Sequence, residues 1–153
     1  MKIFTKILLI TFIVFAAIQF VRPARNNSSE ELATDITKTI HVPDDVLNIL
    51  KNSCYDCHTD NSRYPWYANI QPVGWMMAKH IKAGKADLNL SEFGTYSGRK
   101  QANKLRVIES SIRDRSMPIK NYTMMHRDAT LSNEDKDLIT KWVSLTRDSL
   151  MKN

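Results

Sequence analysis

The chain contains the run Cys54-Tyr55-Asp56-Cys57-His58, and the fold predicted for the remaining residues depends on it. A C-x-x-C-H run is the attachment sequence of c-type haem. Two residues between the cysteines allow both thiols to reach the two vinyl groups of one haem from a single helical turn. The histidine that follows then lies under the iron as the proximal ligand. Since these are the only cysteines in the sequence, we predict one heme c, with its iron, attached at Cys54 and Cys57.

Three other interpretations of this run find less support in the sequence. A thioredoxin-like redox pair needs a βαβ context, and the sequence has no convincing parallel strands. A zinc site would need a further histidine, taken from His41, His80 and His126. Structural zinc sites usually also show a second closely spaced ligand pair, which the sequence lacks. A disulfide across two intervening residues would close a very small loop and gain little stability.

Length and charge limit the class of protein. The 153 residues, of which 42% are hydrophobic and 25% charged, fit one small globular domain with appendages. The net charge is +6, and two of the positive charges, Lys2 and Lys6, belong to the N-terminal leader. The remaining basic residues form no stripe, so the sequence indicates an acidic partner surface at most and no nucleic acid.

The leader predicts export. Residues 7–21 carry no charge and lie between Lys6 and Arg22. Their length falls between the core of a signal peptide and a full membrane span. Because cleavage signals are poor, we predict an uncleaved membrane anchor over residues 1–23, with a cleaved signal as the alternative. The expected location is the bacterial inner membrane with the domain facing the periplasm, or the periplasm itself if the leader is cleaved.

The rest of the chain predicts an all-α domain. Residues 24–42 are polar and indicate a tether, and residues 43–150 form the predicted c-type haem-binding domain. Helices are expected from Pro43 to the haem-attachment run, over 73–85, over 99–113, and from Ser132 onward, where Asp135 completes a capping box. This gives four to five short helices behind an N-terminal hydrophobic helix. The long loops between them need a central group to hold them, as a covalent haem would.

The candidates for the sixth iron ligand are the methionines and histidines of the chain. Met117 is preferred because Pro118 follows it, which holds the residue out of a helix in an extended conformation suited to a ligand loop. A thioether ligand is also the usual choice for electron transfer, since it raises the reduction potential. His80 and His126 are the rivals and would give a bis-histidine site. The predicted metal ligands are therefore His58 and Met117.

With these residues in hand, the chain resembles the haem-binding domain family of small bacterial c-type cytochrome-like proteins over about residues 40–146. The resemblance rests on Cys54-x-x-Cys57-His58, Tyr64-Pro65-Trp66-Tyr67, Pro72 with Trp75, His80 with Gly84, Leu88-Asn89-x-Ser91, Met117-Pro118 with Tyr122, His126-x-x-Ala129-x-Leu131-Ser132, and Trp142. It implies a small cytochrome c-like fold with Cys54 and Cys57 as attachment points and His58 as proximal ligand.

The sequence departs from the family pattern at two positions. Phe93 stands where a tryptophan is expected, and Arg115 stands where a glycine is expected before the Met-Pro pair. The resemblance also leads us to expect a proline carbonyl, that of Pro72 or alternatively Pro65, to accept a hydrogen bond from the ring of His58.

The function expected from the sequence is that of a one-electron carrier or redox module, not an enzyme, with no catalytic residues. A redox partner protein is expected, and membrane contact is expected through the N-terminal helix. The alternatives are a haem-based sensor and a peroxidase-like enzyme with an open sixth position, for which His126-Arg127 is a thin candidate for acid–base work.

Overall fold

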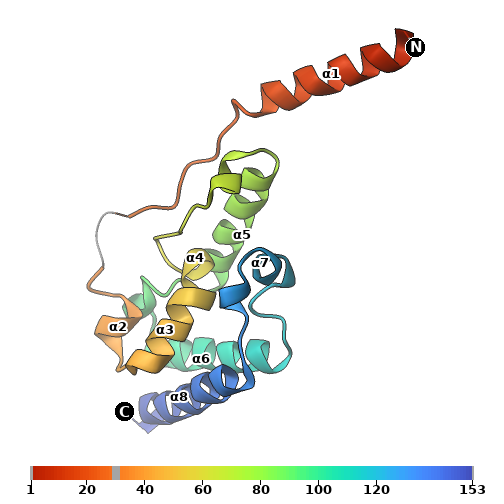
Figure 1. Cartoon of the computed structure of the whole chain (residues 1–153). Coiled ribbons are helices and arrows are strands. Elements are labelled where there is room, and N and C mark those ends of the chain that lie inside the picture. Colours follow the sequence, from red (N-terminus) through yellow and green to blue (C-terminus); the bar gives the residue numbers. More distant parts are fainter. Residues whose placement is uncertain (1, 29–31, 153) are drawn as a thin grey trace.

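The computed structural model describes residues 2–28 and 32–152, and within them it is helical with no strand (Figure 1). The α-helices are α1 (Lys2–Ile18), α2 (Ile36–Thr39), α3 (Asp44–Ser53), α4 (Tyr55–His58), α5 (Val73–Asp87), α6 (Gly98–Arg113), α7 (Lys120–Met125) and α8 (Asn133–Lys152). Short 3₁₀ turns are η1 (Trp66–Asn69), η2 (Phe93–Thr95) and η3 (Arg127–Ala129). The all-α prediction is confirmed. The four longer helices expected after the leader are α3, α5, α6 and α8, and the single turns α2 and α4 and the short α7 raise the number above the prediction.

Two helix starts follow the sequence signals that predicted them. Pro43 precedes α3, whose first turn carries Asp44 and Asp45 at the positive end of the helix dipole. At α8 the capping box is reciprocal: the Ser132 N–H donates to Asp135 Oδ2 at 2.8 Å, and the Asp135 N–H donates to Ser132 Oγ at 3.0 Å. These bonds satisfy main-chain donors that no helical carbonyl can reach.

The core lies where α6 and α8 pack lengthwise and α3 packs on α8, in the lower half of Figure 1. Its residues are aliphatic or aromatic and nearly all fully buried: Ile36, Val46, Leu50, Leu90, Phe93, Leu105, Ile112, Leu131, Ile139, Trp142 and Val143. Phe93, at the position where the family pattern has tryptophan, is among them. The core therefore holds together the helices that surround the haem-attachment run.

The leader helix α1 projects from the domain in Figure 1, and none of its described side chains is buried. Within residues 2–28 and 32–152, no helix combines the length and apolar character needed to cross a membrane. The structure thus gives no support to the anchor predicted for residues 1–23.

The segment expected to be a tether is attached to the domain at both of its described ends. Asn26 donates through Nδ2 to the Thr59 carbonyl at 2.8 Å and to Ser62 Oγ at 2.9 Å. Further along, Ile36 of α2 is completely buried in the core. Residues of the range 24–42 therefore belong to the domain's packing instead of extending away from it.

The turn α4, which carries Cys57 and His58, packs closely on α5 because Gly84 has no side chain. A Cβ at this position would lie 2.6 Å from the carbonyl oxygen of Cys57, well inside van der Waals contact. A glycine is thus required for the two helices to approach, although it lowers helix propensity.

Candidate functional site

The last four residues of the C-x-x-C-H run, Tyr55–His58, form the single turn α4, which follows α3 after a break at Cys54. The His58 N–H donates to the Cys54 carbonyl at 3.0 Å, so the run closes one helical turn, as its spacing predicts. Both cysteines are free thiols and half-buried. One helical turn therefore brings Cys54, Cys57 and His58 together.

The thiols are poorly suited to thiol–disulfide chemistry. Burial raises the pKa of Cys54 to about 12, with a smaller contribution from Cys57. Burial also raises the pKa of Cys57 to about 11, with a further contribution from the negative charge of Asp56. Redox-active cysteines have lowered pKa values, because the thiolate is the reactive form. The described residues also contain no group of three or more His, Cys, Asp and Glu side chains arranged to hold a metal ion.

A largely apolar cavity of about 230 Å³ adjoins this turn. Its wall includes Cys54 and His58 from the haem-attachment side and Met117 with Pro118 from the loop between α6 and α7. The remaining residues come from α3, α5, α6 and the segments near them: Leu50, Ser53, Asp87, Leu88, Leu90, Lys104, Val107, Ile108, Ser111, Ile112 and Leu131. The structure therefore brings the two predicted axial ligands to the wall of one cavity.

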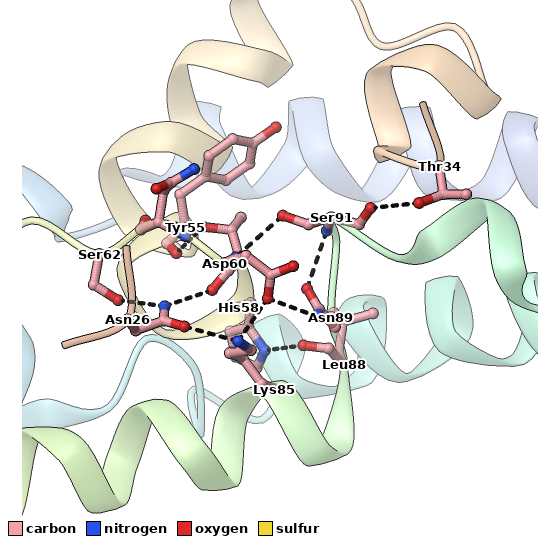
Figure 2. A network of polar contacts seen from close by, with 12 residues as sticks. Asn26, Thr34, Tyr55, His58, Asp60, Ser62, Lys85, Leu88, Asn89 and Ser91 are labelled. Carbon is pink, nitrogen blue, oxygen red and sulfur yellow. Dashed lines mark hydrogen bonds and ion pairs between the residues drawn. The ribbon is translucent and has the colours of Figure 1, made fainter. Parts of the chain in front are cut away.

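The ring of His58 is oriented by a main-chain carbonyl. Its Nδ1 lies 3.0 Å from the carbonyl oxygen of Leu88, directly after α5 (Figure 2). Because a carbonyl can only accept, Nδ1 carries the proton, and Nε2 is left with its lone pair for a metal. The expectation of a Pro72 or Pro65 carbonyl is wrong. The end of α5 supplies this carbonyl because Gly84 lets α5 pack against α4.

Met117 lies between α6 and α7 and outside both helices, as Pro118 after it predicted. It is 40% exposed. The loop that carries it is tied to the end of α6, where the N–H groups of Ser116 and Met117 donate to the Ser111 carbonyl at 3.0 and 3.2 Å. Arg115 has φ 56°, the left-handed conformation that glycine adopts most easily. The glycine expected at this position would adopt the same left-handed conformation without a steric penalty.

The rival histidines line a second cavity of about 240 Å³, together with Cys57. His126 shares a hydrogen bond of 2.9 Å between its Nε2 and the Tyr67 hydroxyl, and its ring stacks on Tyr122 at 4.3 Å between centroids. Neither His80 nor His126 appears in the wall that His58 and Met117 share. The structure does not place both thiols in the wall of the same cavity, since Cys54 lines the first and Cys57 the second.

Asp56, between the two cysteines, is a site residue that the sequence reasoning missed. Its carboxylate is buried and accepts from the Tyr122 hydroxyl at 2.7 Å and from the Arg63 Nε at 3.2 Å. The hydrogen bond to Asp56 and burial together raise the pKa of Tyr122, with burial the larger cause. This carboxylate ties the haem-attachment turn to α7. The Tyr122 in the family pattern was the available signal, but nothing in the sequence pairs it with Asp56.

One of three comparisons with known proteins identifies a family for this chain. The model of the haem-binding domain family matches residues 13–145, which is most of the chain. The chain therefore belongs to the haem-binding domain family, and haem is its cofactor. A search of curated proteins and a search of solved structures each gave no match.

The residues present fit a haem on the chemistry of the donor set. An imidazole with its Nδ1 committed to a carbonyl offers Nε2 to iron, and a thioether borders the same cavity. The aliphatic wall between them suits an apolar macrocycle. Of the two free thiols, that of Cys54 borders this cavity, while that of Cys57 on α4 borders the second one.

Proposed function

We propose that this protein is an exported one-electron carrier that holds a haem c through thioethers to Cys54 and Cys57, with His58 and Met117 as axial ligands. The observation that carries the proposal is that His58 and Met117 border one apolar cavity beside Cys54. When bound, the haem supplies a one-electron couple between ferric and ferrous iron. The chain's own residues bind it, orient the imidazole and exclude water.

A carrier is favoured over a peroxidase-like enzyme by the position of Met117. A thioether on the iron leaves no site for peroxide, whereas a peroxidase needs an open position with a distal acid–base group. His126, the candidate for such a group, lines the other cavity and is bonded to Tyr67. Export is proposed because c-type haem is attached outside the bacterial cytoplasm and because α1 presents apolar side chains on all its sides.

The test is to express the full chain in a host with working haem attachment and to measure its denatured mass and its visible spectrum. We expect one haem added to the polypeptide mass, and a reduced-minus-oxidised spectrum of low-spin c-type haem. A mass equal to the bare polypeptide would contradict the attachment. Ready binding of carbon monoxide by the reduced native protein would contradict the methionine ligand and favour the sensor or enzyme. The mass of the N-terminal peptide decides whether the leader is retained.

A further inference from the structure

The segment Leu88-Asn89-Leu90-Ser91 holds His58 at two points. The Leu88 carbonyl accepts from the ring Nδ1 at 3.0 Å, and the Leu90 N–H donates to the His58 carbonyl at 2.7 Å. The imidazole and the main chain of His58 are therefore both bonded to one short stretch that follows α5. Any group that fixes this stretch also fixes the direction in which the His58 ring presents Nε2.

Asn89 is the group in the centre of that stretch, and its side chain bonds in two directions. It is only 3% exposed. Its Nδ2 donates to Asp60 Oδ1 at 3.1 Å, while its Oδ1 accepts from the Ser91 N–H at 3.1 Å, which closes an Asx turn. An ionised carboxylate could not donate, and an aliphatic side chain of the same shape could do neither. The position thus requires an amide.

Asp60, the partner of Asn89, is itself fixed from three sides (Figure 2). Its N–H donates to Ser91 Oγ at 3.1 Å, and its carboxylate forms an ion pair of 2.5 Å with Lys85 on α5. Lys85 Nζ in turn donates to Asn26 Oδ1 at 2.7 Å. Asp60 lies only two residues after His58. The network therefore links the segment that carries His58 to the stretch that carries Leu88, whose carbonyl accepts from the His58 ring.

We propose that Asn89, held by Asp60, is a positioning residue for the haem iron: it fixes the Leu88 carbonyl against the His58 ring and thereby sets the reduction potential. A carbonyl that accepts from Nδ1–H makes the imidazole a stronger donor to iron, which favours the ferric state and lowers the potential. Loosening the carbonyl weakens this donation and raises the potential. The inference rests on the proposed function, because it needs His58 to be an iron ligand.

The experiment compares the wild-type holoprotein with the Asn89→Ala variant. Redox titration of the haem should show a higher reduction potential in the variant. In the reduced protein, the ring N–H of His58 should exchange with solvent faster, as followed by nuclear magnetic resonance. Asn61→Ala is the matched control, since it removes an exposed asparagine that directly follows Asp60 in the chain. It should change neither quantity. An unchanged potential and an unchanged exchange rate in Asn89→Ala would overturn the inference.

A double variant separates positioning from a general loss of packing. Asn89→Asp alone removes the amide donor and sets a second carboxylate against Asp60, whereas Asn89→Asp combined with Asp60→Asn restores a donor–acceptor pair with its direction reversed. The potential of the double variant should return toward that of the wild type. If Asn89→Ala fails to fold, Asn89→Asp supplies the single change, and failure of the double variant to recover then overturns the inference. Absence of covalent haem in the wild type would instead refute the proposed function.

Discussion

The two sides of the cavity proposed to hold the haem are held in different ways. On the His58 side, the ring and main chain bond to residues 88–90, and a buried amide and an ion pair lie behind them. On the Met117 side, the residue is 40% exposed and its loop is tied mainly to the Ser111 carbonyl. The polypeptide itself therefore fixes His58, the proposed proximal ligand, whereas Met117, the proposed distal ligand, lies on a more adaptable loop. If both residues bind iron as proposed, replacing His58 should therefore have a larger effect than replacing Met117.

The largest effect is expected from His58→Ala. The substitution removes the imidazole from the cavity and leaves the Leu88 carbonyl without its donor, so both haem binding and local packing suffer. We expect the yield of haem-loaded protein to fall by at least about tenfold, measured by haem staining of denatured gels against total protein. A yield equal to that of Met117→Ala would contradict the difference between the two sides.

Met117→Ala should leave the haem covalently attached, because the thioethers do not depend on the sixth ligand. The variant should lose the weak near-infrared methionine–iron band, show a lower reduction potential and bind carbon monoxide. Met124→Ala is the matched control, since Met124 is an exposed methionine of α7 outside this cavity wall. If Met117→Ala kept its band and potential while His80→Ala or His126→Ala lost the native spectrum, the site would be bis-histidine.

Gly84→Ala tests how closely the proximal side is packed. A Cβ there meets the Cys57 carbonyl at 2.6 Å, so α4 and α5 must separate, and we expect a loss of about 1–3 kcal/mol in the free energy of unfolding. The control is Gly98→Ala at the start of α6, where a Cβ meets nothing within 4 Å. Because alanine favours helix, this control should gain up to about 1 kcal/mol. Urea unfolding of both variants measures the difference, and equal stabilities would show that the close approach is unimportant.

The smallest effect is expected from Arg115→Gly on the distal side. Glycine removes the cost of a side chain at φ 56° but adds freedom to the unfolded chain, so the net change should stay within about 0.5 kcal/mol. Arg113→Gly, two residues earlier in α6, should destabilise by about 1 kcal/mol because it places glycine in a helix and removes the ion pair with Glu109. Thermal unfolding of the two variants checks this order, and a larger loss in Arg115→Gly would reverse our interpretation of the loop.

Local patterns in the sequence determined the helices and the haem-attachment turn. The spacing of Cys54, Cys57 and His58 fits one helical turn, the Ser132–Asp135 capping box starts α8, and Pro118 keeps Met117 out of a helix. Each of these depends on residues within a few positions of one another. Backbone geometry alone then fixes what they form.

Only the tertiary structure decided which groups meet across long separations. The carbonyl that orients His58 belongs to Leu88, 30 residues away, and a main-chain carbonyl leaves no mark in the sequence. The same holds for Asp56 with Tyr122, 66 residues apart, and for the separation of His80 and His126 from the Met117 cavity. These pairings follow from how α4 packs on α5 and how α7 folds back over the turn. The physical reason is that every carbonyl of a chain is an equally good acceptor until packing brings one of them within reach.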